Sequence, residues 1–371
     1  MRNKYAAVLD FGSSNITVLV GEHGVNNNFK ILGSGQADYA GFMDGEFLQP
    51  NTLKASIQSA IEKAEEGFGD KIKTLYIGVP SDFCIIHEVD AEIAFGKRVC
   101  VTEKHLDKLF AKVNGSLDSQ SMLVSVSPMY YLLDDGNRVN NAIGIYTTSL
   151  RARVSMVFVE NKFVHMISSI MQECGNIDFE LVCSMLAENL YLLEPDKRSV
   201  GAVLVDCGYI TTSASFACGE GLSDLSSFSL GGGFITGDIS NSLNLSFAEA
   251  EQLKRKLILS IDATELDYYE LYVGGDQVEK VHAKTANDVA LLSIDNIVQG
   301  IKSCLEQFTS KMDDGEPIYL TGGGLSYLKG AKAYISNALG RKIEIVKPKS
   351  LQYMQPELSS VISLLNFALM K

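Results

Sequence analysis

Two aspartates each stand at the end of a short apolar run and in front of a turn rich in Gly, Ser and Thr. Asp10 precedes the turn Gly12-Ser13-Ser14-Asn15, and Asp206 precedes the turn Gly208-Tyr209-Ile210-Thr211. Both stretches predict a strand, a tight turn and a second strand. The backbone N–H groups of such a hairpin can bind phosphate while its carboxylate holds a hydrated Mg²⁺. One copy alone would be an ordinary hairpin whose Asp makes an Asx turn, and two copies favour the phosphate site.

The composition excludes several classes of protein. The chain has 371 residues, enough for two or more domains, and 46% of them are hydrophobic. Its formal net charge of −13 argues against a nucleic-acid-binding surface and against binding to acidic lipid by charge alone. Seven scattered cysteines without a CxxC pair predict reduced core thiols in a cytosolic protein, and the histidines show no metal-ligand spacing. Neither a signal peptide nor a membrane-spanning run is expected.

The pattern of apolar residues predicts the elements that position the two turns. The chain divides into three predicted segments. The first and the third both read as a hairpin followed by strands and helices, and this loose repeat indicates two related α/β halves that face a cleft. The first segment predicts strands over 5–10, 16–22, 29–35 and 75–79 and an amphipathic helix over 52–68. Residues 83–162 predict a small α+β insertion with short strands over 85–93, 123–126, 129–133 and 143–150 and a helix from Thr102. The remainder predicts helices over 163–174, 184–193, 246–257, 288–312, 329–339 and 356–370, with strands over 318–320 and 343–346.

Three motifs, taken in order, resemble a known superfamily. They are Asp10-Phe11-Gly12-Ser13-Ser14, Asp206-Cys207-Gly208 and Thr321-Gly322-Gly323-Gly324. They resemble the first phosphate, second phosphate and adenosine motifs of actin, sugar kinases and heat-shock chaperones. Each motif alone is weak, but the ordered set spans nearly the whole chain. Within this superfamily the chain resembles the bacterial cell-division family FtsA, from about residue 5 to 368, on the stretches 41–45, 57–66, 101–103, 231–239 and 250–254.

The resemblance implies a fold and a division into subdomains. The implied fold is α/β and actin-like, with duplicated RNase H-like domains around a nucleotide cleft and a small α+β insertion domain of the FtsA type. Subdomain 1A would comprise residues 1–82, 163–197 and 346–371, and subdomain 1C, the insertion, residues 83–162. Subdomain 2A would comprise residues 198–240 and 299–345, and subdomain 2B residues 241–298.

The same resemblance implies that the cleft binds ATP and Mg²⁺. Asp10 and Asp206 would hold Mg²⁺ through water. The phosphates would be contacted by Gly12, Ser13, Ser14, Asn15, Gly208 and Thr211, and by the helix that Gly232 and Gly233 open, since a helix N-terminus favours anions. Gly322, Gly323 and Gly324 would let the nucleoside lie close to the backbone.

Two further groups have an implied role and a plainer alternative. Glu251, Lys254 and Arg255 share one helical face and would sandwich the adenine and hold the ribose, whereas the face alone is typical of a solvated charged helix. The residue that orients attacking water in the superfamily falls at Glu188 or Asn189. A carboxylate there could act as general base, and a surface Glu at a helix end is the equal alternative.

The turn after Asp206 departs from the family pattern. FtsA proteins carry a run of glycines there, then paired Thr and a further Asp, whereas this chain has Ile210 in place of a glycine and Ser213 in place of the acid. A β-branched residue makes a turn with positive φ costly. The sequence therefore predicts a phosphate grip that is weaker or differently shaped, and ATP hydrolysis that is weak or absent.

As a function, the resemblance implies a cell-division scaffold that polymerises head to tail. It would link the tail of the tubulin-like FtsZ, bound near residues 241–298, and other division proteins, bound through residues 83–162, to the membrane. The implied location is cytoplasmic, at the inner face of the cell membrane at the division site. The helix over 356–370 is apolar nearly all round, which predicts a packed domain helix and not an interfacial anchor. An anchor outside this sequence, membrane contact through a partner, and no membrane contact stay open.

Three other functions stay possible on the sequence. A PilM-like scaffold of type IV pilus assembly would share residues 232–238 and 250–254. An acid or sugar kinase of the superfamily would need a catalytic Asp in the cleft, for which the sequence offers no convincing candidate. A degenerate scaffold would bind no nucleotide.

Overall fold

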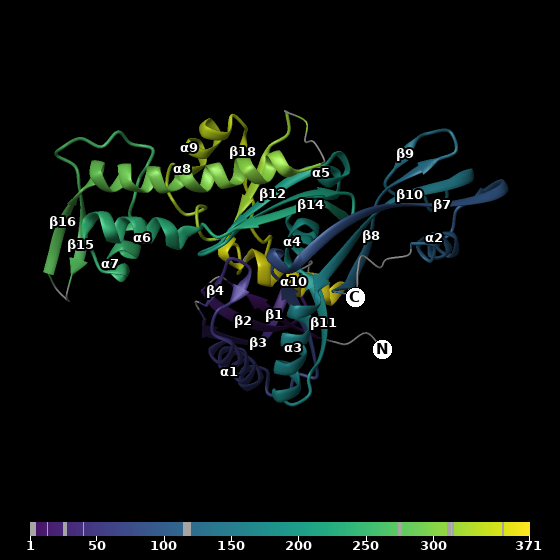
Figure 1. Ribbon diagram of the computed structural model, residues 1–371, viewed down its shortest axis with the longest axis horizontal. Coiled ribbons are helices and arrows are strands. Elements are labelled where there is room, and N and C mark those ends of the chain that lie inside the picture. Colours follow the sequence, from purple (N-terminus) through teal and green to yellow (C-terminus); the bar gives the residue numbers. More distant parts are fainter. Residues whose placement is uncertain are drawn as a thin grey trace.

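The structure, a computed structural model, describes residues 5–12, 14–24, 28–39, 41–113, 120–273, 277–309, 313, 315–350 and 352–371. This part of the chain forms an elongated molecule built from two five-stranded sheets and a four-stranded sheet (Figure 1). One end carries a hairpin of β15 (Tyr268–Val273) and β16 (Gln277–His282), and the other end carries the four-stranded sheet.

The first half is a five-stranded sheet in the order β11-β6-β1-β2-β3. Residues of β1 alternate between its two faces, because successive side chains of a strand point to opposite sides. Leu9 packs with helices α1 and α3, and Val8 packs with α10 on the other face. The elements are β1 (Ala6–Phe11), β2 (Asn15–His23), β3 (Phe29–Asp38), β6 (Thr74–Val79), β11 (Asp178–Cys183), α1 (Pro50–Phe68), α3 (Asn161–Glu173), α4 (Ser184–Leu192) and α10 (Ser359–Met370).

The second half repeats this strand order as β18-β17-β12-β13-β14. In each half the first three strands pair antiparallel and the next two join in parallel, so the duplicated fold expected from the sequence is confirmed. The elements are β12 (Ala202–Cys207), β13 (Thr212–Cys218), β14 (Gly221–Phe228), β17 (Ile318–Thr321), β18 (Ile343–Ile345), α5 (Pro195–Val200), α6 (Gly232–Leu243), α7 (Phe247–Lys254), α8 (Ala283–Gln307) and α9 (Ala331–Leu339).

The described part of the insertion, predicted as residues 83–162, is an antiparallel sheet in the order β7-β10-β8-β9 together with the helix α2. Its strands are far longer than expected, and residues 151–160, predicted as no strand, belong to β10. The charged side chains Arg151 and Arg153 interrupt the apolar pattern there, but they pair with acidic residues of β7 across the sheet. The elements are β7 (Cys84–Cys100), β8 (Ser121–Leu133), β9 (Arg138–Val139), β10 (Tyr146–Glu160) and α2 (Glu103–Phe110).

Smaller elements complete the described chain. Residues 41–48 hold a tight hairpin of β4 (Phe42–Met43) and β5 (Glu46–Phe47). Short 3₁₀ helices, η2 (Ser81–Phe83) and η3 (Pro356–Leu358), precede β7 and α10. The strands β11, β14, β15 and β16 were not expected, because their polar residues hide the alternation that identifies a strand.

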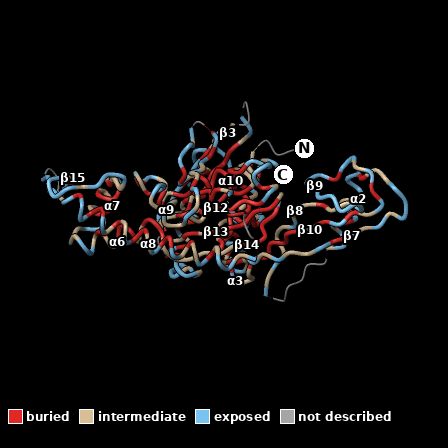
Figure 2. Tube along the Cα trace, turned by 90° about the horizontal axis from the view of Figure 1, so that it is seen from above, coloured by how far each residue is buried: buried red, intermediate tan, exposed pale blue. Residues whose placement is uncertain are grey.

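Burial is concentrated where the two large sheets and their helices meet, in the middle of the molecule (Figure 2). α10 is buried along most of its length against β1 and α4, so it is the packed domain helix that the sequence predicts. No helix within the described ranges is long and apolar enough to span a membrane. The boundaries of the four subdomains stay a prediction.

Candidate functional site

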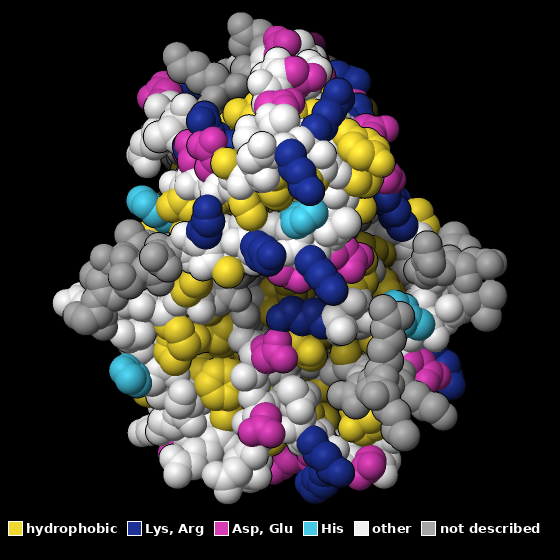
Figure 3. All heavy atoms as spheres, turned by 90° about the vertical axis from the view of Figure 1, so that its right-hand side faces the viewer, with side chains coloured by type: hydrophobic (Ala, Val, Ile, Leu, Met, Phe, Trp, Pro, Cys, Tyr) yellow, Lys and Arg dark blue, Asp and Glu magenta, His cyan; other side chains and the backbone are white. Residues whose placement is uncertain are grey.

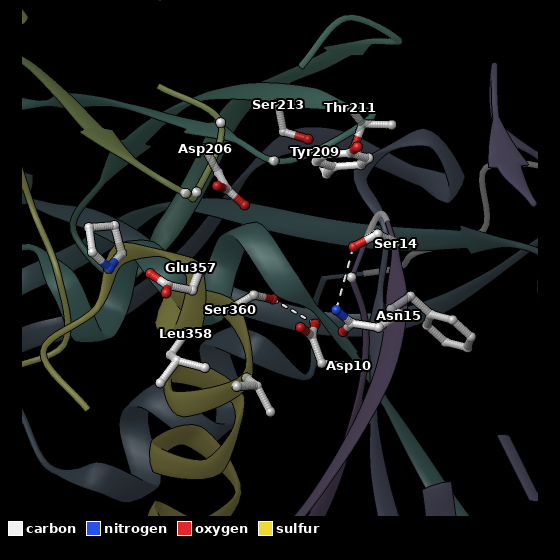
Figure 4. A pocket seen from close by; sticks show the side chains of 18 of the residues that line it. Asp10, Ser14, Asn15, Asp206, Tyr209, Thr211, Ser213, Glu357, Leu358 and Ser360 are labelled. Carbon is white, nitrogen blue, oxygen red and sulfur yellow. Dashed lines mark hydrogen bonds between the residues drawn. The ribbon is translucent and has the colours of Figure 1, made fainter. Parts of the chain in front are cut away.

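A cavity of about 650 Å³ lies between the two halves, and residues of both line it (Figure 4). The sequence-predicted residues that line it are Asp10, Gly12, Ser14, Asn15, Glu188, Asp206, Gly208, Thr211, Glu251, Lys254, Arg255, Gly322, Gly323 and Gly324. Asn189, Gly232 and Gly233 do not line it. Ser13 lies outside the described residues. The fold thus brings five separate stretches of sequence, 10–15, 188, 206–211, 251–255 and 322–324, around one cavity.

The two aspartates occupy equivalent positions in their hairpins. Asp10 pairs with Thr17 across β1 and β2, and Asp206 pairs with Ser213 across β12 and β13. In each hairpin one more residue pair follows, and then a loop of four residues: the first loop, residues 12–15, and the second loop, residues 208–211. The matching register means that each half presents one carboxylate and one loop to the cavity.

The two carboxylates differ in their electrostatic setting. Burial raises the pKa of Asp10 to about 6, although the hydroxyl of Ser360 donates a hydrogen bond of 2.6 Å to its Oδ1 (Figure 4). Burial and the charge of Asp10 raise the pKa of Asp206 to about 7. Buried carboxylates with raised pKa values are typical of sites that await a positively charged ligand.

Glu188 is a third acid at the same place. It lies on α4, its residue is only 1% exposed, and its Oε2 has no hydrogen-bond partner among the described residues. Burial, and then the charges of Asp206 and Asp10, hold the pKa of Glu188 well above its usual range. The alternative interpretation of Glu188 as a surface residue is therefore wrong.

Asn189, the other candidate for orienting water, belongs to the core. Its Nδ2 donates to the carbonyl of Met185 at 2.7 Å and to Oγ of Ser215 at 2.8 Å, and its residue is fully buried. It links α4 of the first half to β13 of the second. Of the two candidates, only Glu188 faces the cavity.

The second loop is held from behind by α6. The N–H of Gly232 donates to the carbonyl of Gly208 at 2.9 Å, and the N–H of Gly233 donates to that of Tyr209 at 2.6 Å. The N-terminus of α6 is therefore bound to loop carbonyls. The loop also contains no residue with positive φ, so Ile210 causes no strain of that kind.

The charged face of α7 forms a compact network. The ammonium of Lys254 is 2.7 Å from Oε2 of Glu251 and donates to the carbonyl of Gly232 and the hydroxyl of Thr236, both at 2.9 Å. These three contacts use all three of its N–H groups. Burial lowers the pKa of Lys254, against the opposing effect of Glu251. Arg255 pairs with Oε1 of Glu251 at 3.0 Å and is largely exposed. The alternative of a solvated charged helix therefore applies to Arg255, whereas Lys254 is buried.

The glycines after β17 fit tightly against the second hairpin. A Cβ on Gly322, whose φ is +85°, would lie 2.1 Å from Oδ1 of Asp206 and 2.3 Å from the carbonyl of Cys207. A Cβ on Gly324 would lie 2.4 Å from the carbonyl oxygen of Gly208. The N–H of Gly324 donates to the carbonyl of Cys207 at 2.7 Å. Glycine at these positions leaves the space in which the Asp206 carboxylate lies.

Several lining residues escaped the sequence analysis. They include Ser360 on α10, and Asp82, Tyr209, Tyr327 and Glu357. The Ser-Ser pair at the start of α10 is the one signal that could have pointed to Ser360, since small hydroxyl residues commonly lie at helix starts.

The site fits a hydrated divalent cation bound with a polyphosphate. The buried Asp10 and Glu188 and the partly buried Asp206 line one cavity, Oε2 of Glu188 has no partner among the described residues, and loop residues of both halves line the same cavity. In the described part of the chain, no three His, Cys, Asp or Glu side chains form a direct metal site. That Asp10 and Asp206 hold a cation through water stays a prediction.

Comparisons with known proteins agree with this fold. The family described as "Cell division protein FtsA" matches residues 203–363. FtsA of Staphylococcus epidermidis is 23% identical over 369 residues, which cover 98% of this chain and 78% of the relative. Among solved structures, the PilM-PilN type IV pilus biogenesis complex matches with a TM-score of 0.65 at 16% identity, over 100% of this chain and 99% of the other. MreB5 of Spiroplasma citri bound to ADP matches with a TM-score of 0.58 at 11% identity, over 98% and 95%.

The duplicated sheets with a cavity between them form an actin-like fold, and the two structural matches share that fold. Within this class the sequence matches are to FtsA along nearly the whole chain. The chain therefore resembles the FtsA family of cell-division proteins in sequence, and its fold is actin-like.

Proposed function

We propose that the chain binds ATP with Mg²⁺ in the cavity and assembles head to tail as a scaffold of cell division. The observation that carries this proposal is the pair of aspartates at equivalent register positions, one from each half, which face the same cavity. A ligand that contacts both carboxylates and both loops would stabilise one relative position of the halves, which is how a nucleotide can act as a conformational ligand.

Each part of the cavity has a proposed role. The first loop offers the hydroxyl of Ser14 and the amide of Asn15 to phosphate oxygens. The second loop offers Thr211, whereas the N–H of Gly208 donates to the carbonyl of Thr211 at 2.9 Å, so Gly208 contributes close backbone approach and no donor. Asp10 and Asp206 hold the water of the cation. When bound, Mg²⁺ supplies positive charge that offsets the phosphates and the two carboxylates. Burial and the charges of Asp206 and Asp10 raise the pKa of Glu188, which disfavours the carboxylate form that a general base needs, so we propose binding with weak hydrolysis.

The nucleoside lies, in this proposal, beside α7 and the glycines 322–324. The network around Lys254 fixes the wall of this part of the cavity, and the exposed guanidinium of Arg255 remains available to a ligand. Tyr327 and Leu328, which also line the cavity, supply apolar surface for a base.

We further propose the insertion and the β15–β16 end as contact surfaces. Exposed Lys97, Arg98, Lys104 and Lys108 lie on the insertion, and Lys and Arg side chains gather over this end of the molecule (Figure 3). Such a surface suits an acidic partner, and the chain as a whole is acidic, so a second copy qualifies. The FtsZ tail is the proposed partner of residues 241–298, and the proposed location is the cytoplasmic face of the membrane at the division site.

Sedimentation with and without Mg-ATP tests the proposal. We expect the wild-type chain to pellet more with Mg-ATP and the Asp206→Ala variant to lose this dependence. Pelleting that ignores both the nucleotide and the substitution would refute the link between nucleotide and assembly.

The alternatives make different predictions. The likeness to the PilM chain is one of fold, whereas the FtsA relatives match in sequence, which favours the division scaffold. Phosphoryl transfer from ATP to a small metabolite, measured in a coupled assay, would favour the kinase instead.

A further inference from the structure

The end of β13 that is remote from the cavity lies against the insertion. β13 begins directly after the second loop and ends at Cys218, in the turn 218–221 that leads into β14. The N–H of Glu220 in this turn donates to the carbonyl of Pro128 in β8 at 3.0 Å. A Cβ on Gly219 would lie 2.0 Å from the carbonyl oxygen of Met129, so the turn and β8 touch backbone to backbone.

Side chains reinforce this contact. The hydroxyl of Ser155 in β10 donates to the carbonyl of Leu222 at 2.5 Å, and both groups are buried. The guanidinium of Arg138 in β9 donates to Sγ of Cys218 at 3.1 Å. Met129 packs in the core of the second half, although its strand belongs to the insertion.

The turn itself is held by a buried arginine. Arg198 of α5 is 3% exposed, and its guanidinium donates to the carbonyl of Gly219 and to Oε1 of Glu220, both at 2.8 Å. The N–H of Gly219 donates back to the carbonyl of Arg198 at 3.0 Å. These hydrogen bonds fix the conformation of the turn, so we expect the turn and β8 to move together.

The insertion is covalently connected to the first half, but its non-covalent contacts described above are with the second half. Residues 83 and 162 join it to the first half, whereas the turn 218–221 binds it to the second. β13 spans seven residues, about 23 Å. The centre of β13 is buried at Ala214 and Ser215, so we expect the strand to move as one rigid element between the second loop and β8.

We propose that β13 and the turn 218–221 transmit the state of the nucleotide cavity to the insertion. When a ligand moves the second loop toward the first half, β13 and the turn 218–221 move with the loop. Because the turn is bound to β8, β8 moves as well, and the angle between the insertion and the first half changes. The insertion's contact with the next copy then depends on the nucleotide. This inference rests on the proposed function of the cavity.

Hydrogen exchange with and without Mg-ATP tests the inference, together with thermal unfolding. In the wild-type chain we expect Mg-ATP to slow exchange at least twofold in residues 205–215 and also in residues 121–133 of the insertion. The Gly219→Ala variant should keep the slowing in 205–215 and lose it in 121–133. Its Mg-ATP-dependent pelleting should fall at least fivefold.

Gly136→Ala is the matched control. Gly136 lies in the insertion with φ of +81°, and a Cβ added to it would have no atom within 4 Å, so it shares the strained backbone but not the clash. This variant should behave as wild type. If Gly219→Ala fails to fold, the double variant Ser155→Ala with Arg138→Met removes two side-chain contacts of the same interface and should give the same loss.

The outcomes separate the two proposals. Slowing in 205–215 without any change in 121–133 of the wild type overturns the transmission through β13 and leaves nucleotide binding intact. An equal response in Gly219→Ala and wild type overturns it as well. No slowing and no thermal shift anywhere refutes nucleotide binding, and the inference falls with it.

Discussion

The hairpins β1–β2 and β12–β13 carry their aspartates at the same register position, yet the two loops are fixed differently. Asp10 accepts a hydrogen bond from Ser360, and Asp206 accepts none from the described residues. The second loop, in contrast, is bound by its carbonyls to α6 and continues into the buried strand β13. The duplication thus yields one hairpin whose acid is held by a side chain and one whose loop is held by its backbone.

This difference indicates a division of roles. In the proposed site, the first hairpin would offer the side chains of Ser14 and Asn15 to a ligand, whereas the second hairpin connects the cavity to α6 and to the insertion. Substitutions near Asp206 should therefore have larger structural effects than those near Asp10.

The largest expected effect is that of Gly322→Ala. The new Cβ would meet the Asp206 carboxylate and the Cys207 carbonyl, and φ of +85° adds strain. We expect the free energy of unfolding to fall by about 3 to 5 kcal/mol. Gly340→Ala, with φ of +64° and open space, should cost only about 1 kcal/mol. Chemical denaturation measures both, and equal losses would show that the second hairpin is not crowded.

Lys254→Met comes next. It removes the ammonium that binds Glu251, Thr236 and the Gly232 carbonyl, and so leaves a partly buried carboxylate without its nearest cation. We expect a loss of about 3 kcal/mol. The matched variant Arg255→Met should leave stability nearly unchanged, because that side chain is 75% exposed, and should weaken ATP binding instead. A larger loss of stability in Arg255→Met would reverse our view of this network.

Asp206→Asn and Asp10→Asn compare the two acids directly. Both remove a negative charge from a site that raises the pKa of its aspartates, so both should raise the thermal stability of the nucleotide-free protein at pH 8. Asp206→Asn should raise it more, by about 1 to 3 kcal/mol, because its pKa is shifted further and no hydrogen bond to it is lost. Calorimetry decides the order, and a larger gain for Asp10→Asn would contradict the comparison.

The smallest effect concerns pH. Between the ordinary pKa of an aspartate and the folded-state values of about 6 and about 7, the folded protein binds more protons than the unfolded chain. The contribution of these groups to stability is therefore full only below the ordinary pKa of an aspartate, and it is lost progressively as pH rises through about 6 and about 7. We expect the nucleotide-free protein to melt a few degrees lower at pH 8 than at pH 5.5. Asp206→Asn should show a smaller difference, and an unchanged one would exclude Asp206 as its source.

Much of the site was predictable because it depends on local sequence. The hairpins were predicted since each combines an apolar run, an acid and a Gly-rich turn, and the observed pairing follows that pattern. The roles of individual glycines were less accessible. The motif predicts that Gly322 contacts a nucleoside. In the structure, however, glycine is required there because a Cβ would clash with the carboxylate of Asp206.

Contacts between distant segments were beyond the reach of local patterns. Ser360 lies 350 residues from Asp10 in sequence. The length of β10 and its contact with the turn 218–221 depend on pairing partners that polar residues such as Arg153 conceal. For the same reason the insertion was predicted as a domain but not as one bound to the second half.

Thermal unfolding with Mg-ATP is the most direct test of a nucleotide site between the two hairpins. A ligand at a hundred times its Kd stabilises the folded state by about 2.7 kcal/mol. We expect saturating Mg-ATP to raise the Tm of the wild-type chain by several degrees, with a smaller rise when a chelator removes Mg²⁺ and none in Asp206→Ala. No rise in the wild type, or an equal rise in Asp206→Ala, would contradict the site proposed between Asp10 and Asp206.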